Sequence, residues 1–146
     1  MAITSAICNS FKQEILEAEH NFTASTGNTF NLALYTSSAT LGAGTTAYTS
    51  SNEITNTSGT AYSAKGKALT SVTPTLDSST AVCDFADVSW TSASFSAKGG
   101  LMFYESHSSD AAVCAVAFGG DKTVSSGTFT IQFPAAAATT AIIRIA

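Results

Sequence analysis

Charged side chains are scarce in this sequence. They make up 11% of its 146 residues, whereas globular domains typically carry about 25%. The six basic residues are scattered along the chain, and nucleic-acid binding requires clustered Lys or Arg to neutralise phosphates. We therefore expect no direct contact with nucleic acid. The polar surface must come mostly from Ser, Thr and Asn, which suits a protein packed among copies of itself or other subunits. It also suits an exposed, protease-resistant extracellular protein.

Long apolar runs are also missing. No stretch approaches the roughly 20 apolar residues of a membrane-spanning helix, so we expect no contact with a membrane. No basic residue precedes Ile3, and Lys12 and Glu14 interrupt any apolar run near the N-terminus. These features argue against a secretory signal peptide. We expect the chain to be made and folded in a cytoplasm, even if it later acts outside the cell.

Cysteine is rare and unevenly spaced. The three residues, Cys8, Cys83 and Cys114, match no zinc-binding pattern. Cys83 shares strand parity with Phe85, and Cys114 shares it with Phe118, so both thiols are predicted to face the core. Buried, reduced Cys acting as a small apolar side chain is the favoured interpretation. A Cys83–Cys114 disulfide or an intersubunit bond is the alternative.

Groups suited to catalysis are few and poorly arranged. The histidines are His20 and His107. His107 is close in sequence to Ser108 and Asp110, but a Ser–His–Asp triad is assembled from distant segments, so a solvated turn is predicted there. The aspartates lie beside predicted turns, where Asp is an ordinary residue. We therefore expect a protein that is not an enzyme, with no catalytic residue, no cofactor and no metal site.

Strand patterns dominate from residue 29 onward. Residues 29–36 alternate apolar and neutral side chains, and further strands follow at the short spacing of an all-β sandwich or barrel. Near the end, Phe129, Ile131 and Phe133 alternate with polar residues, and a last strand is predicted over 141–145 with Arg144 facing outward. We predict one domain, residues 1–146, with an antiparallel β-sandwich or jelly-roll-like core at 61–146 and one N-terminal α-helix.

Several residues mark local features of this core. Pro74 indicates an edge strand or a bulge, because Pro cannot donate to the sheet. Gly99-Gly100 indicates a bulge or a close backbone approach. Residues 119–122, Gly-Gly-Asp-Lys, are predicted to form a turn. Trp90 alternates with Val88 and is predicted to lie in the core.

The N-terminal segment is the best helix candidate. Over residues 4–20, an apolar stripe is formed by Ile3, Ile7, Phe11 and Ile15, which repeat at i+4. This helix, within residues 1–20, either packs on a sheet or projects as an arm into a neighbouring subunit. If it is an arm, deleting residues 1–20 should leave a folded β core.

Residues 37–60 form a long polar excursion rich in Ser, Thr and Gly. A loop of this length in a compact domain is usually functional or ordered by a partner. Tyr48 and Tyr62, on either side of its second half, are candidates for stacking on a sugar or for subunit packing, and packing in the core or an interface is the favoured interpretation. We predict that the helix and the excursion contact neighbouring subunits. The predicted contact residues are Ile7, Phe11, Ile15, Leu41, Tyr48 and Ile54.

Three stretches are distinctive when taken together. They are TSAICNSFKQEIL at residues 4–16, LALYTSSATLGAGTTAYTSSNEI at 32–54 and FGGDKTVSSGTFTIQFPAAAATTAIIRIA at 118–146. In this order and at this size, the chain resembles a group of small proteins encoded by tailed bacteriophages. The likeness covers nearly the whole length and is one of overall sequence, not of a mechanistic motif. It implies a virion structural protein with no catalytic residues.

We therefore expect a non-enzymatic structural protein located in a phage virion. The first expectation is a capsid decoration or cement subunit that contacts the major capsid protein and forms a symmetric homo-oligomer. A tail, fibre or extracellular filament subunit is an alternative under the same logic. A glycan-binding jelly-roll module, recognising a host glycan through Tyr48, Tyr62 or loop Asp residues, is the second hypothesis.

Overall fold

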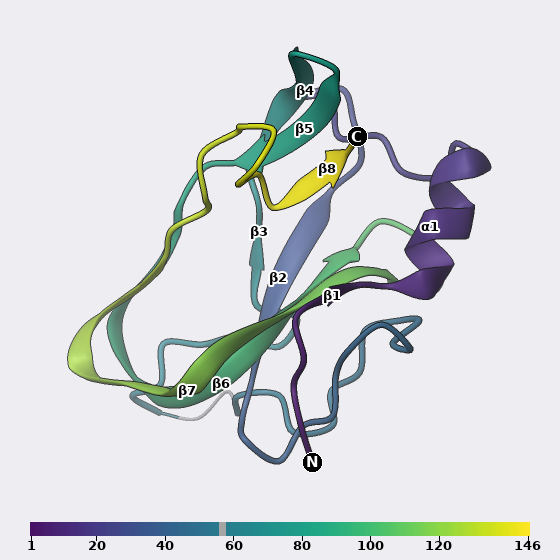
Figure 1. The fold of residues 1–146 in the computed structure, drawn as a ribbon. Coiled ribbons are helices and arrows are strands. Elements are labelled where there is room, and N and C mark those ends of the chain that lie inside the picture. Colours follow the sequence, from purple (N-terminus) through teal and green to yellow (C-terminus); the bar gives the residue numbers. More distant parts are fainter. Residues whose placement is uncertain (56–57) are drawn as a thin grey trace.

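The chain folds into antiparallel sheets with one short helix among the residues described (Figure 1). The computed structural model describes residues 1–55 and 58–146, so Asn56 and Thr57 of the predicted excursion lie outside the described residues. The elements are β1 (Ala6–Ile7), α1 (Asn9–Leu16), β2 (Phe30–Tyr35), β3 (Lys67–Ala68), β4 (Ser71–Asp77), β5 (Thr80–Phe85), β6 (Val88–Tyr104), β7 (Ala111–Ile131) and β8 (Ile143–Ile145).

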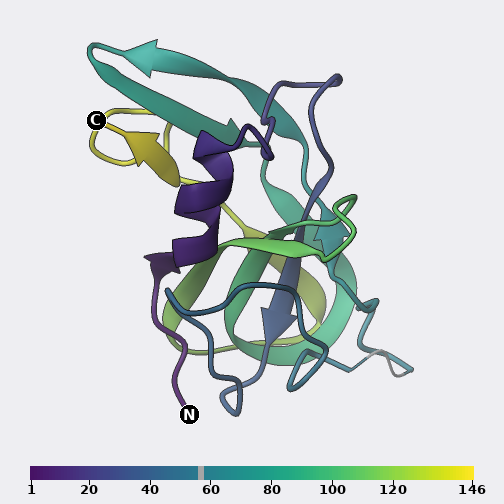
Figure 2. The same cartoon turned by 90° about the vertical axis from the view of Figure 1, so that its right-hand side faces the viewer.

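A five-stranded sheet has the order β1-β7-β6-β2-β3, and a three-stranded sheet has the order β4-β5-β8. Figures 1 and 2 show the three-stranded sheet at one end of the molecule and a bent ribbon of β6 and β7 at the other. The predicted mainly β, antiparallel fold is confirmed and is consistent with a β-sandwich. The jelly-roll connectivity stays a prediction.

β6 and β7 form the long ribbon that organises the fold. They span 17 and 21 residues and pair from Val88↔Ile131 to Tyr104↔Ala111 with four register shifts. β-bulges bend a strand and increase its twist, which accounts for the curled ribbon in Figure 2. The predicted turn at residues 119–122 is wrong, because these residues lie inside β7. Gly119 has a φ of 77°, a conformation open to Gly that lets the strand bend without ending.

Two adjacent glycines allow the strands to approach closely in the centre of the large sheet. A Cβ atom on Gly99 would lie 2.5 Å from the carbonyl oxygen of Val116, and one on Gly100 would lie 3.1 Å from that of Ala33. A register shift falls between Ala97 and Gly99. The predicted bulge or close backbone approach at this pair is therefore confirmed.

Aromatic side chains join the two sheets. Phe22 and Phe30 stack with ring centroids 4.3 Å apart, and Phe85 of β5 lies 6.1 Å from Phe22 and 6.4 Å from Phe30. Trp90 is 1% exposed, which confirms its predicted place in the core. The three-stranded sheet is thus attached to the large sheet through the end that carries Phe85.

The N-terminal segment differs from the predicted helix. Instead of beginning a helix, β1 pairs with Ala115 and Cys114 of β7, and Ile3 forms a parallel bridge with Leu41. α1 starts only at Asn9 and ends at Leu16. The apolar i+4 stripe was a misleading signal here, because pairing with β7 satisfies the backbone groups that a first helical turn would have used. The segment packs on the chain's own sheet, so it is not a free arm.

The structure of the three-stranded sheet agrees more closely with the predictions made from the sequence. β4 is an edge strand that contains Pro74, and its register shifts between Val72 and Thr75, so both predicted roles of the proline are confirmed. The last strand is shorter than the predicted 141–145, but Arg144 is exposed as expected. Phe129, Ile131 and Phe133 are half-buried between exposed neighbours, as their alternation indicated.

Candidate interaction surface

The three-stranded sheet carries its charged side chains on one face, which they share with Val72 and Val82. Leu76 of β4 lies opposite Ala81 of β5, and Ala81 lies opposite Ile145 of β8. Directly opposite residues share a face of a sheet, so these three side chains form a row across all three strands, which we call the open row. By strand alternation, the charged residues of the sheet lie on the other face; they are Asp77, Asp84 and Arg144.

The face that carries the open row is covered at one end and uncovered at the other. At the covered end, Phe85 is 2% exposed and Ile143 is 4% exposed. At the open end, Leu76 is 72% exposed and Ile145 is 55% exposed. The alternation that buries Phe85 and Ile143 thus continues to Leu76 and Ile145, but none of the described residues covers them.

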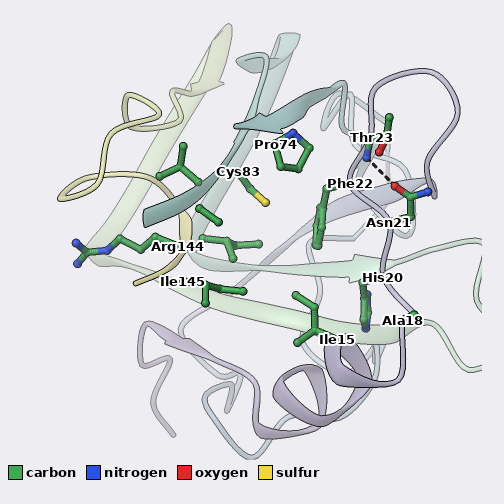
Figure 3. A pocket seen from close by; sticks show the side chains of 13 residues that line it. Ile15, Ala18, His20, Asn21, Phe22, Thr23, Pro74, Cys83, Arg144 and Ile145 are labelled. Carbon is green, nitrogen blue, oxygen red and sulfur yellow. Dashed lines mark hydrogen bonds between the residues drawn. The ribbon is translucent and has the colours of Figure 1, made fainter. Parts of the chain in front are cut away.

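A groove of about 500 Å³ lies beside the open row (Figure 3). One wall is formed by α1 and the segment after it, and the other by the three-stranded sheet. The apolar lining residues are Ile15, Ala18, Phe22, Pro74, Ala81, Val82, Cys83, Ile143 and Ile145. The side chain of Arg144 extends away from the groove in Figure 3, and its Nη1 donates a 2.8 Å hydrogen bond to the carbonyl oxygen of Ala138.

His20 forms a buried part of the helix-side wall. Its side chain is 0% exposed, and its Nε2 lies 2.6 Å from Oε2 of Glu14. Its ring packs against Phe11 at 4.8 Å and against Phe22 at 6.3 Å. The contact with Glu14 connects the segment after α1 to the helix. Because the surrounding rings enclose the imidazole, it is not accessible to a ligand in the groove.

The six predicted contact residues lie in or against the core of their own chain. Phe11, Leu41 and Ile54 are 3%, 4% and 6% exposed. The other three are half-buried and pack against that core; they are Ile7, Ile15 and Tyr48. Of the six, Ile15 lines the groove. Contact with a neighbouring subunit stays a prediction. Because Phe11, Leu41 and Ile54 are buried, such a contact could use only the half-buried residues Ile7, Ile15 and Tyr48.

The polar excursion is anchored by a buried carboxylate. Glu53 is 8% exposed; its Oε1 accepts hydrogen bonds from the Tyr62 hydroxyl at 2.7 Å and the Lys65 backbone N–H at 2.8 Å. Its Oε2 accepts one from the Tyr48 hydroxyl at 2.6 Å. The Tyr62 oxygen in turn accepts a 2.8 Å bond from the N–H of Leu34 in β2. Contacts within the chain therefore hold the part of the excursion around Tyr48 and Glu53 in place.

These contacts bear on the glycan hypothesis. Tyr62 is 1% exposed and stacks against Trp90 at 6.0 Å, so the favoured core packing is confirmed for this residue and the alternative of a sugar platform is wrong. The ring of Tyr48 already packs against Phe103 at 4.9 Å, and Nζ of Lys65 lies 5.7 Å from its centroid. The remaining candidates for sugar binding are the half-buried Tyr48 and the loop aspartates.

The turn between β6 and β7 holds the other candidates considered from the sequence. Nδ1 of His107 lies 2.9 Å from Oγ of Ser109, and Asp110 pairs with Nζ of Lys65 at 2.9 Å. The side chains of His107 and Asp110 thus have different partners, although the backbone N–H of Asp110 donates a 3.0 Å hydrogen bond to the carbonyl oxygen of His107. Across residues 1–55 and 58–146, no group of three His, Cys, Asp or Glu side chains is placed to hold a metal ion, and no helix is long and apolar enough to cross a membrane.

All three cysteines are free thiols. Cys8 and Cys114 are buried, whereas Cys83 is half-buried and lines the groove. Burial raises the pKa of Cys83 to about 11 and that of Cys114 to about 12. The core-facing position of Cys114 is confirmed. Cys83 does share a face with Phe85, but it lies closer to the open end of that face and is therefore less covered.

Comparison of the chain with models of protein families, with curated proteins and with solved structures found no match. The resemblance to phage structural proteins stays a prediction carried by the three stretches quoted above. The sequence did not single out Leu76 and Ile145 as surface residues, because each follows the alternation of a side chain that faces a core. Their exposure became visible only with the strand register and the packing in hand.

Proposed function

We propose that this chain is a non-enzymatic structural subunit of a bacteriophage particle, best described as a capsid decoration protein. Its role is to add contact area between neighbouring capsid subunits, including the major capsid protein, and so to stabilise the particle. A subunit of this kind acts through its shape and its surface. The three stretches that resemble phage proteins supply the virion context for the proposal.

The open row is the observation that carries the proposal. Contiguous exposed apolar patches of a few hundred Å² or more mark sites of interaction, and we infer the same role for the open row. Leu76 and Ile145 belong to a sheet face whose other end forms the core. That face is therefore suited to burial, and a neighbouring protein would complete the cover that the chain itself does not provide.

The remaining surface suits close packing as well. Charged residues are 11% of the chain, and exposed stretches of the ribbon are built from Ser and Thr, such as Ser89 and Thr130, whose hydroxyl oxygens lie 2.8 Å apart. Burying short neutral side chains carries a smaller desolvation cost than burying charges. Such a surface is compatible with many neighbours in a shell.

Localisation in purified particles tests the proposal. Phage particles would be isolated by density gradient, their proteins identified by mass spectrometry, and this chain located by antibody labelling under the electron microscope. We expect it in stoichiometric amounts on the head, and we expect particles lacking it to lose their genome at lower temperature and to be rescued by added protein. Its absence from particles would refute the proposal, and labelling of the tail or of a filament would select those alternatives.

A further inference from the structure

We propose that the bend in β7 holds a binding site for an alkyl carboxylate, a ligand with an apolar chain and one anionic end. The inference does not rest on the proposed function, because it concerns the ribbon of β6 and β7 and not the open row. It follows from three features that the structure places together, namely a strand that folds back on itself, an enclosed apolar cavity and a lysine beside them.

The middle of β7 faces the end of the same strand. Phe129 follows Phe118 by 11 positions, so a straight strand would place the two residues about 36 Å apart, at about 3.3 Å per residue. Their ring centroids are only 6.3 Å apart. β7 therefore turns back on itself, as the curled ribbon in Figure 2 shows, and side chains from both of its parts line the space inside the bend.

A groove of about 430 Å³, which we call the ribbon groove, lies inside this bend. Its apolar walls are Val116 and Phe118 from the middle of β7, and Phe129 and Ile131 from its end. All four side chains are half-buried, so they retain apolar surface that a ligand would cover. Small-molecule sites have volumes of about 300–1,000 Å³ and mostly apolar linings, and the ribbon groove fits this description.

A smaller cavity of about 90 Å³ continues the ribbon groove toward the core. It shares Val116, Phe118 and Ile131 with the groove and extends to Met102, which is 0% exposed. Of the described residues that line this cavity, Gln132 alone is polar. Apolar cavities stay dry, and one of about 150 Å³ binds benzene or xenon. A cavity smaller than that has room for the end of an alkyl chain, which is narrower than a ring.

Lys122 supplies the positive charge of the site. It is the charged member among the described residues that line the ribbon groove, and it forms no ion pair within residues 1–55 and 58–146. Asp121 precedes it, but successive side chains of a strand point to opposite faces, and Asp121 does not line the groove. The ammonium group of Lys122 can therefore donate charge-assisted hydrogen bonds to a carboxylate of the ligand.

These features together specify the class of ligand. The apolar cavity accepts the end of an alkyl chain, the walls at Phe118 and Phe129 cover its middle, and Lys122 pairs with its anionic end. A peptide fits less well, because its backbone N–H and C=O groups would lose their hydration against apolar side chains without gaining a partner from them. A free alkyl carboxylate meets both the apolar and the charged part of the site.

Isothermal titration calorimetry of the full chain tests the proposal. Sodium decanoate, used below its micellar concentration, should bind one-to-one with a dissociation constant between about 10 μM and about 1 mM. Hexanoate should bind at least about 10-fold more weakly, because it buries fewer methylene groups. Decyltrimethylammonium should also bind at least about 10-fold more weakly than decanoate, although the net charge of −4 attracts this cation to the chain.

Methyl-group NMR spectroscopy locates the bound ligand. Decanoate should shift the methyl signals of Val116, Met102 and Ile131, which line the cavity. The methyl signals of Leu76 and Ile145 in the open row should stay unchanged, because these residues line neither the ribbon groove nor the cavity. Shifts confined to the open row would show that the chain binds elsewhere and would overturn the proposal.

Two exposed lysines provide a matched pair of variants. Lys122→Gln should weaken decanoate binding about 10-fold and leave the binding of decyltrimethylammonium no weaker than in the wild type. Lys12→Gln makes the same change in net charge on α1, away from the ribbon groove, and should retain the wild-type affinity for decanoate. Circular dichroism would show that both variants keep the native fold, as expected for substitutions at exposed positions.

Several results would contradict the proposal. They are the absence of saturable decanoate binding, equal affinities for the anionic and cationic ligands, and equal weakening by Lys122→Gln and Lys12→Gln. Vesicles of phosphatidylglycerol form a further arm of the experiment. Binding to vesicles without binding of decanoate would show that a lipid surface is recognised and not a free alkyl carboxylate, which would also overturn the proposal.

Discussion

The Tyr62 hydroxyl donates a 2.7 Å hydrogen bond to Oε1 of Glu53, and both residues are buried. The same hydroxyl oxygen accepts a bond from the N–H of Leu34 in β2. One phenol therefore links the large sheet to the carboxylate that anchors the polar excursion. Buried polar groups contribute to a unique fold when all their bonds are made and are costly when one is lost.

Tyr62→Phe should destabilise the protein by about 1–3 kcal/mol, because it leaves the Leu34 N–H unsatisfied and removes one donor from Glu53. Urea unfolding followed by circular dichroism measures the change. Tyr48→Phe is the control: Glu53 keeps its bonds from Tyr62 and Lys65, and Tyr48 is half-exposed, so its effect should be smaller. Equal stability of Tyr62→Phe and the wild type would contradict this assignment.

Alkaline pH should destabilise the fold. Burial raises the pKa of Tyr35, Tyr48 and Tyr62 above the ordinary value near 10. Above about pH 10 the unfolded chain releases phenolic protons that the folded chain retains, so the free energy of unfolding falls as pH rises. Urea unfolding at a series of pH values measures this fall. Tyr62→Phe should make it less steep, and native-state ultraviolet titration of all tyrosines near pH 10 would contradict the prediction.

The thiols should react slowly in the native protein. Burial raises the pKa of Cys83 from 9.0 to about 11, which lowers its thiolate fraction at neutral pH about 100-fold. Cys8 and Cys114 are buried and should react more slowly still. Titration with a chromogenic disulfide should find three thiols in denaturant. A single thiol in denaturant would show that a disulfide had formed.

Gly99→Ala should destabilise the large sheet by about 1–3 kcal/mol or more, as overpacking does. Its new Cβ would lie 2.5 Å from the backbone oxygen of Val116 and 2.8 Å from Cγ2 of Ile3. Gly120→Ala is a matched control on β7, since nothing lies within 4 Å of the position that its new methyl group would occupy, and it should change stability by less than about 0.5 kcal/mol. Thermal unfolding of both variants measures the difference, and equal melting temperatures would refute the close approach.

Removal of residues 1–8 should unfold or strongly destabilise the protein, in contrast to the dispensable arm that was one of the two alternatives from the sequence. The deletion removes β1 and the side chains of Ile3 and Cys8, which are 9% and 0% exposed. Burial of one large apolar side chain contributes roughly 1.5–3 kcal/mol, and the lost pairing with β7 adds to this. A truncated chain with wild-type dispersion in its amide NMR spectrum would contradict the prediction.

Local patterns predicted much of the fold. Alternation identified the strands around Phe30 and Phe129, and the chemistry of proline identified Pro74 as an edge residue. These signals succeed because a side chain's direction along a strand depends on its immediate neighbours. The apolar stripe of Ile3, Ile7 and Phe11 failed because it fits a helix, whereas a partner more than 100 residues away determines the conformation at Ile7.

The candidate site was harder to predict than the fold. The Glu53–Tyr62 bond depends on packing that no local pattern encodes. The exposure of the open row could not be predicted for a different reason. Leu76 and Ile145 follow the alternation that is typical of buried strand residues, and they are exposed only because they lie at the end of the sheet. An interface residue and a core residue have the same sequence signature, since each is suited to burial.

The pairing of β1 with β7 has a consequence for biosynthesis. Ala6 pairs with Ala115, so 109 positions separate two residues that must meet. Until the ribosome has added β7, β1 has no strand to pair with. This strand pair therefore cannot form before synthesis has passed Ala115, and contacts between residues this far apart in the sequence form slowly.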